Sequence, residues 1–202
     1  VTQTDIESSG ETHCDKLMGF TVPSRSARGR MVRLDRVLDE VLSAHAYPPP
    51  IKHLLAEALV LGALMGGLLK AEAAQMTMQA QTEGGIVKLL VCDYRAGAIR
   101  GYADFDAERL AGLGANLSLA TLFGAGYLAI TFDTEGAQRY QGIVPLEGDS
   151  LSEACEVYFS QSEQLPTLIR VASRVQGGRC EAAGLLVQHL PDGEEGRERL
   201  HV

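Results

Sequence analysis

Four cysteines carry the side chains whose chemistry would be easiest to recognise, since thiolates act as nucleophiles, redox switches and zinc ligands. They are Cys14, Cys92, Cys155 and Cys180, and no two lie close enough for a C-x-x-C pair or a zinc-binding spacing. Cys155 falls on the apolar face of a predicted helix and Cys92 ends a buried-looking strand, so both are expected to be inert core thiols. Cys14 and Cys180 have polar neighbours and are expected to be exposed, with no function assigned. Dispersed cysteines without a recognisable signal peptide are typical of reduced thiols in the cytoplasm.

Histidines and acids do not form a metal-binding or catalytic motif. His53 and Glu57 share a predicted helix face, but H-E-x-x-H is absent from the sequence. The phosphate-binding pattern G-x-x-x-x-G-K-[ST] and the nucleophile pattern G-x-S-x-G are absent as well. The sequence therefore predicts no metal site and no catalytic residue, and an enzyme is not expected. The histidines are scattered at His13, His45, His53, His189 and His201.

One glycine pattern leaves an alternative open. Gly124-Ala-Gly126-Tyr-Leu-Ala129 fits the dinucleotide-binding pattern G-x-G-x-x-[G/A], and Glu147 lies about twenty residues further on. That motif requires a helix after the glycines, with its N-terminus facing the pyrophosphate. The run Tyr127–Asp133 alternates instead and is rich in strand-forming residues, which favours a turn before a strand. An enzyme that binds a nucleotide or a small molecule through this turn remains the alternative hypothesis.

The charge of the chain limits its partners. The net charge of −8 argues against a nucleic-acid binder and against docking on an anionic membrane. The apolar run Ala58–Leu69 is too short to cross a bilayer and predicts a buried helix. A local run of arginines could bind an anion or an acidic partner, although a solvated strand and turn is the favoured interpretation. These arginines are Arg25, Arg28, Arg30, Arg33 and Arg36.

A central apolar helix is the main element expected to position the rest of the chain. It is predicted from about Ile51 to Ala71, after the helix breaker Tyr47-Pro-Pro-Pro50 and a preceding helix over residues 35–45. Gly62, Gly66 and Gly67 within this helix predict close approach of another backbone, because glycine otherwise weakens a helix.

Alternating patterns predict strands around that helix. The capping box Ser150-Leu-Ser-Glu153 predicts one further helix, to about Ser160, and Asp106–Ala120 is expected to be a loop or a short helix. Strands in runs with helices between them indicate an α+β fold, with mixed or antiparallel sheets packed around the central helix. The predicted strands are Lys16–Val22, Arg28–Leu34, Gln75–Gln81, Ile86–Asp93, Ala98–Phe105, Tyr127–Asp133, Tyr140–Leu146, Thr167–Val175 and Ala183–Leu190.

Three blocks between Leu122 and Pro166 carry a resemblance to a known family. Tyr47-Pro-Pro49, Arg100-Gly-Tyr-Ala103 and the run from Ala182 to Gln188 support it. The chain closely resembles the redox-regulated thirty-three-kilodalton heat-shock chaperones of bacteria, from about Phe20 to Pro191. The three blocks contain Gly124, Gly126 and Tyr127, then Tyr140, Gln141, Gly142, Glu147, Gly148 and Asp149, then Ser162, Glu163, Gln164 and Pro166.

The resemblance implies a holdase, which binds unfolding proteins under oxidative and heat stress without ATP. It also implies a cytoplasmic homodimer, in which domain swapping is left open, and no nucleic-acid or membrane partner. The motif residues are expected to build turns and hydrogen bonds, and client-binding residues are not assigned.

The redox switch implied by the resemblance is a C-terminal module in which C-x-C and C-x-x-C pairs bind zinc and form disulfide bonds on oxidation. None of the four cysteines matches those pairs, so zinc is expected only in the full-length protein. We expect a frayed N-terminus over residues 1–15, a chaperone core over 16–191 and the start of a linker over 192–202. Whether the zinc module is deleted, disordered or naturally absent is left open.

Overall fold

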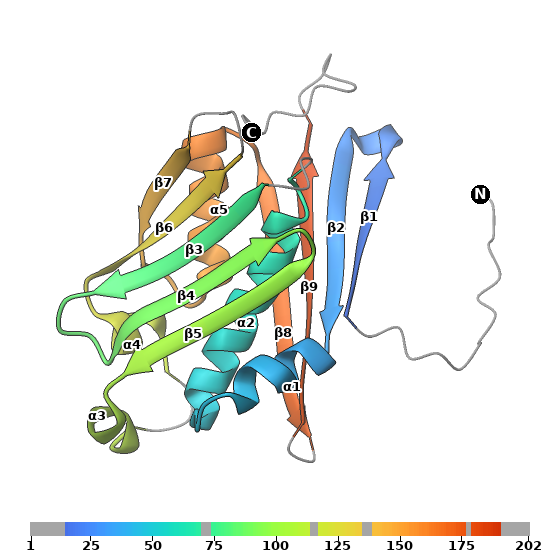
Figure 1. Cartoon of the computed structure of the whole chain (residues 1–202). Helices are drawn as coiled ribbons and strands as arrows, with labels where there is room; N and C mark the ends of the chain where they lie inside the picture. The colour runs from blue at the N-terminus through green and yellow to red at the C-terminus, as the bar shows by residue number, and fades with distance from the viewer. Residues whose placement is uncertain (1–14, 70–73, 114–116, 135–138, 177–178, 191–202) are drawn as a thin grey trace.

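Two antiparallel sheets enclose one helix in this protein (Figure 1). The computed structural model describes residues 15–69, 74–113, 117–134, 139–176 and 179–190. The four-stranded sheet has the order β1-β2-β9-β8, and the five-stranded sheet has the order β5-β4-β3-β6-β7. The α+β expectation is confirmed, and every pairing between the described strands is antiparallel. The strands are β1 Lys16–Val22, β2 Ala27–Leu34, β3 Gln75–Thr82, β4 Val87–Arg95, β5 Ala98–Phe105, β6 Gly126–Asp133, β7 Tyr140–Pro145, β8 Thr167–Gln176 and β9 Arg179–His189.

The helices differ greatly in length. The longest is α2, and it contacts strands of both sheets. Asp106–Ala120, expected to be a loop or a short helix, contains α3 and the beginning of α4. The helices are α1 Arg36–Ser43, α2 Pro49–Gly66, α3 Ala107–Ala111, α4 Leu119–Phe123 and α5 Leu151–Tyr158, with a 3-10 turn at Pro23–Arg25 and a π-helical turn at Phe159–Glu163.

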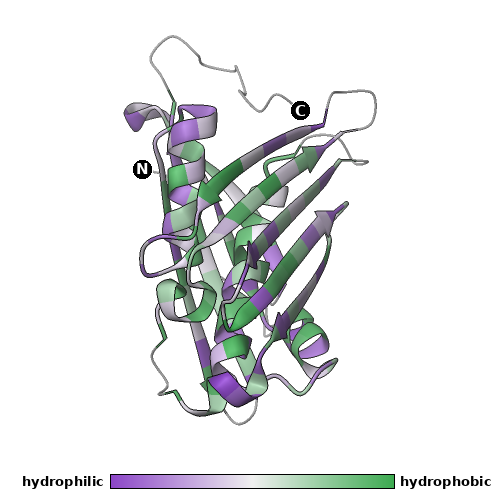
Figure 2. Ribbon diagram, turned by 90° about the vertical axis from the view of Figure 1, so that its left-hand side faces the viewer, coloured by the Kyte–Doolittle hydropathy of each residue, from purple (hydrophilic) through white to green (hydrophobic). Residues whose placement is uncertain are grey.

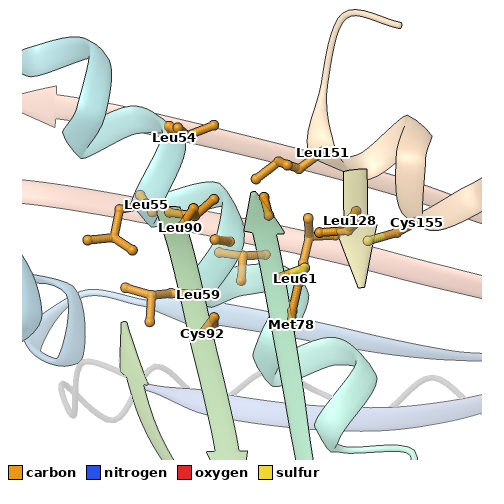
Figure 3. Packing of buried hydrophobic residues seen from close by; sticks show 14 of the residues in the cluster. Leu54, Leu55, Leu59, Leu61, Met78, Leu90, Cys92, Leu128, Leu151 and Cys155 are labelled. Carbon is orange, nitrogen blue, oxygen red and sulfur yellow. The ribbon is translucent and has the colours of Figure 1, made fainter. Parts of the chain in front are cut away.

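Helix α2 is buried all round because a sheet packs on each side of it (Figure 3). A Cβ atom on Gly62 would overlap the Cys92 sulfur of β4, so the close neighbour is a side chain and not the predicted backbone. On the other side, Gly184 of β9 leaves room for Val60 and Leu64. Large side chains at these glycines would push the sheets away from the helix, so the small residues set the thickness of the core.

The bounds of α2 differ from the prediction. The helix begins at Pro49, since a proline in the first turn lacks only an N–H that would have no helical partner. It ends at Gly66, where a Cβ atom would strike the Tyr94 ring, and the neighbouring Gly67 lies against Leu17. The predicted end at Ala71 lies outside the described residues. The Gly-Gly pair therefore ends the helix as well as admitting its neighbours.

Four of the described helices begin at side-chain caps, and Asp106 and Ser118 supply those of α3 and α4. Helix α1 is capped from the start of β1, because Asp15 Oδ1 accepts hydrogen bonds from Asp35 N at 2.9 Å and Val37 N at 3.3 Å. The predicted capping box of α5 forms on one side, with Glu153 N donating to Ser150 Oγ at 3.2 Å. On the other side, Glu153 Oε2 accepts from the preceding residue, Asp149 N, at 2.9 Å. Each cap satisfies helix N–H groups that have no intrahelical acceptor.

Candidate functional site

The outer face of the four-stranded sheet carries the candidate site. Side chains along a strand point alternately to the two faces, and the strand register shows which residues share a row. Met18 of β1 pairs with Met31 of β2, which pairs with Leu185 of β9. In the next row, Phe20 lies over Gly29, followed by Val187 and Leu168 across the sheet. We call these six large side chains the apolar patch: Met18, Phe20, Met31, Leu168, Leu185 and Val187.

The apolar patch remains open to solvent. Met18 is 52% exposed, and Met31 and Leu168 are each 44% exposed. Phe20, Leu185 and Val187 are half-buried. Contiguous apolar surface of this kind is typical of interaction sites, whereas single exposed apolar residues are ordinary. Methionine adds adaptability, because its unbranched side chain conforms to surfaces of different shape.

Basic side chains border the apolar patch. The row after Met31 pairs Lys16 with Arg33, and Arg170 of β8 lies beside Leu185. Arg33 Nη2 lies 3.5 Å from Glu181 Oε2, and Arg174 Nη2 lies 2.8 Å from the same oxygen. These three side chains surround a hollow of about 210 Å³ floored by alanines. The site therefore joins an apolar surface to a basic margin.

The outer face of the five-stranded sheet is more polar, although it also exposes Tyr102, Tyr127 and Ile143. On this face Thr77 Oγ1 donates to Asp93 Oδ1 at 2.5 Å, and Arg100 Nε donates to Asp93 Oδ2 at 2.8 Å. Gln141 Nε2 donates to Thr131 Oγ1 at 2.8 Å. Figure 2 shows hydrophilic and hydrophobic residues alternating along the strands, as expected when one face is buried and the other is wet.

A cleft of about 1160 Å³ lies between α2, the α3–α4 region, the start of α5 and β8. Its lining is largely apolar and includes the carboxylates Glu57 and Asp149, but its described lining residues include no lysine or arginine. Glu57 Oε1 already accepts hydrogen bonds from Ser152 N at 3.0 Å and Ser152 Oγ at 2.7 Å, which join α2 to α5. An anionic phosphate is poorly matched to this lining.

The glycine pattern after Leu122 does not have dinucleotide-binding geometry. Gly124, with φ +57°, ends α4, and Gly126 opens strand β6 instead of a helix. The Gly126 carbonyl accepts from Leu146 N at 3.0 Å, and Tyr127 OH donates to Gln81 Oε1 at 3.1 Å. The structural basis of the alternative hypothesis is therefore absent, because no helix N-terminus follows these glycines.

The second and third motif blocks meet where β7 packs on α5. A Cβ atom on Gly142 would enter the Tyr158 ring, so glycine admits that ring against the strand. Tyr158 OH donates to Glu163 Oε1 at 3.0 Å, and burial raises the pKa of this tyrosine. Ser162 lies beside Gly142, and Gln164 closes the π-helical turn with φ +52°.

The remaining motif residues lie around the ends of β7 and α5. Tyr140 is half-buried against the core, while Gln141 belongs to the polar outer face. Gly148, with φ +92°, and Asp149 precede α5, and Glu147 is exposed. The Pro166 carbonyl accepts from His189 N at 3.0 Å. None of these contacts brings motif residues to the apolar patch.

The cysteines correct one prediction. Cys92 and Cys155 are fully buried, as expected for core thiols, and burial raises the pKa of both. Cys180 was expected to be exposed, but it is only 4% exposed. It belongs to β9, which begins at Arg179 and not at Ala183, and its side chain points to the inner face of the sheet. Cys14 lies outside the described residues.

The arginine run is also divided by the sheet. Arg28 was expected on a solvated strand, but it is 9% exposed and donates from Nε to Gln188 Oε1 at 3.1 Å. Arg30 donates from Nε to the Gly67 carbonyl at the end of α2, at 3.3 Å. Arg33 alternates to the outer face, so the run is not one basic surface. The position of each arginine along β2 decides whether its side chain lies on the inner or the outer face of the sheet.

The described ranges contain neither a metal-binding cluster nor a membrane-spanning helix. No three histidine, cysteine, aspartate or glutamate side chains there are grouped to hold a metal ion, so these residues do not fit a zinc site. In the same part of the chain, no helix is long and apolar enough to cross a membrane.

Sequence reasoning did not find the apolar patch. Its signal was present, because Met18, Phe20 and Val22 alternate along one predicted strand and Met31 stands among arginines in the next. Both faces of these strands carry apolar residues, however, so periodicity alone cannot say which face is covered. The sheet order and register were needed to bring β1, β2, β9 and β8 together.

Comparisons with known proteins place these features in a family context. The family model described as Hsp33 protein matches residues 15–201. A 33 kDa chaperonin of Caulobacter vibrioides is 39% identical over 203 residues, which cover 96% of this chain and 66% of the relative. One of Photorhabdus laumondii is 37% identical and covers 90% of this chain and 61% of the relative. The chain thus spans less than two thirds of the length of these relatives. The crystal structure of the 33 kDa chaperonin from Thermotoga maritima, with a TM-score of 0.75 and 26% identity, covers 86% of this chain and 60% of that one.

Proposed function

Because the chain belongs to the Hsp33 protein family, we propose that it is the client-holding part of an ATP-independent chaperone. A holdase must present apolar surface to chains that have lost their own core. The apolar patch supplies such a surface on a rigid sheet that is anchored from behind by α2. The exposure of Met18, Met31 and Leu168 is the observation that carries the proposal.

The free energy available from burying the apolar patch is suited to weak, reversible binding of a client. Fully burying one large apolar side chain contributes about 1.5–3 kcal/mol, and part of this is lost to ordering of the bound segment. Six such side chains, three of them already half-buried, therefore support reversible capture of an unfolded segment. No hydrolysis is required for this binding, which agrees with a nucleotide-independent mechanism.

Aggregation of a heat-denatured client, followed by light scattering, tests the proposal. The 202-residue chain should suppress scattering at near-stoichiometric amounts without nucleotide, in reducing and in oxidising buffer alike. It should do so in both buffers because the described thiols are buried. Failure in both buffers would contradict the proposed function for this chain.

The finer family properties are part of the same proposal. We propose a cytoplasmic homodimer that binds unfolding proteins under oxidative and heat stress, with no nucleic-acid or membrane partner. Redox control is assigned to zinc-binding cysteines outside these 202 residues, since the four cysteines here are dispersed and those of the described part are buried. Mass measurement of the native full-length protein with and without a zinc chelator tests the metal and the dimer together.

A further inference from the structure

The charge of the outer face differs from the charge of the chain. The whole chain carries a net charge of −8. Among the described strand residues on the outer face of the four-stranded sheet, by contrast, five are basic and one is acidic. They are Lys16, Arg33, Arg170, Arg174 and Arg179, with Glu181 as the acid. Two of these arginines also pair with acids outside the sheet, Arg170 with Glu156 at 2.8 Å and Arg179 with Asp39 at 3.8 Å. With these acids counted, five basic groups face three carboxylates, so this face of an acidic protein keeps a positive balance.

The hollow beside the apolar patch already accommodates a carboxylate. Glu181 Oε2 lies 2.8 Å from Arg174 Nη2 and 3.1 Å from Arg174 Nε. The hydrogen bond from Arg174 lowers the pKa of Glu181, so this arginine favours a charged carboxylate beside it. The side chains of Arg33 and Arg174 remain 49% and 66% exposed. Since each guanidinium has five N–H donors, both can bind a second carboxylate.

The spacing between rows of side chains on this face defines which peptide segment would fit it. Val187, Leu185 and Ala183 follow one another at two-residue intervals along β9. Val187 and Leu185 each belong to one row of the apolar patch, and Ala183 lines the hollow. An extended segment has the same two-residue repeat, about 6.6–6.8 Å, on one face. Two apolar side chains at i and i+2 would therefore cover the patch, and the side chain at i+4 would reach Arg33 and Arg174.

We infer that this face selects extended client segments with apolar residues at i and i+2 and a carboxylate at i+4. The inference rests on the proposed function and specifies its substrate class. Charge complementarity identifies the occupant, because the chain as a whole would repel acidic segments and this face attracts them. A second copy of the chain is a poorer match, since a two-fold contact would place like-charged margins against each other.

Three short peptides that differ only at i+4 test the inference. With glutamate, glutamine or lysine at that position, anisotropy with labelled peptide gives the dissociation constants. The glutamate peptide should bind about three- to tenfold more tightly than the glutamine peptide, and the lysine peptide should bind weakest. Raising the salt from about 0.05 M to about 0.5 M should remove most of the difference, because exposed charges are then screened.

Substitutions in the hollow test whether it causes the preference for the glutamate peptide. Arg33→Gln with Arg174→Gln should make the three peptides bind alike, while Glu181→Gln should increase the preference for the glutamate peptide. Arg95→Gln with Arg100→Gln, on the outer face of the other sheet, is the matched control and should change nothing.

Three outcomes separate the inference from the function. Equal binding of all three peptides overturns the acid selectivity and leaves holdase activity standing. Absence of peptide binding together with unsuppressed aggregation overturns both. If no peptide binds and the arginine variant instead changes a dimer into a monomer in sedimentation, the occupant is a second copy and the inference is wrong.

Discussion

The two sheets of this molecule meet the same helix but present opposite surfaces to water. The four-stranded sheet exposes Met18, Met31 and Leu168 in adjoining rows. The five-stranded sheet exposes a polar network around Asp93 and Arg100, and its exposed apolar residues Tyr102 and Ile143 lie at opposite edges. Both inner faces are covered by α2, so burial of the core does not explain the difference. An outer face that needs only solubility can be satisfied by polar pairs, as in the five-stranded sheet. The apolar outer face of the other sheet therefore indicates a partner.

Polar substitution of the apolar patch is expected to have the largest effect. Met18→Gln, Met31→Gln and Leu168→Gln together should raise the chaperone concentration needed to suppress aggregation more than about tenfold, since several kcal/mol of burial is lost. Light scattering of a heat-denatured client is the measurement. The matched triple on the other sheet is Tyr102→Gln, Tyr127→Gln and Ile143→Gln, which are also exposed apolar residues. An equal loss in both triples would remove the distinction between the faces.

The inner faces, in contrast, should respond alike to overpacking. Gly184→Val would press on Val60 and Leu64, and Gly101→Val would press on Leu55 and Leu59. Each is expected to lower the free energy of unfolding by about 1–3 kcal/mol, measured by urea denaturation. If one change were tolerated and the other not, only one sheet would be packed tightly on α2.

Removal of the α1 cap should have a smaller effect that is confined to stability. Asp15→Ala leaves Asp35 N and Val37 N without their acceptor and should cost about 1 kcal/mol. The thermal midpoint reports this loss, and Asp15→Asn is the control that keeps an acceptor oxygen. A change in client binding at a temperature where the variant is folded would mean that α1 contributes to the site.

The smallest effect is expected at the polar outer face. Arg100→Ala removes the ion pair with Asp93, but the arginine side chain is 80% exposed and the pair is solvated. We expect a change below about 0.5 kcal/mol in urea denaturation and none in aggregation suppression. A loss of suppression would show that the five-stranded sheet also holds clients.

The sequence predicted the helices and strands of the fold better than it predicted the apolar patch. Apolar character over Ala58–Leu69 indicated the central helix, but its glycines were expected to face another backbone and Gly62 instead faces the Cys92 side chain. The burial of Cys180 was missed because its polar sequence neighbours, Arg179 and Glu181, hid the extension of β9 to Arg179. The patch was missed because its strands are far apart in sequence and join only through the order β1-β2-β9-β8.

Photo-crosslinking from single positions tests the central claim most directly. A photoreactive side chain is placed at Met31 in one protein and at Ile143 in another, and each is irradiated with an unfolding client. Both residues are exposed apolar positions, one in the apolar patch and one on the polar outer face. The account predicts a client adduct from position 31 and little from position 143. Equal adducts from both, or an adduct from position 143 alone, would contradict it.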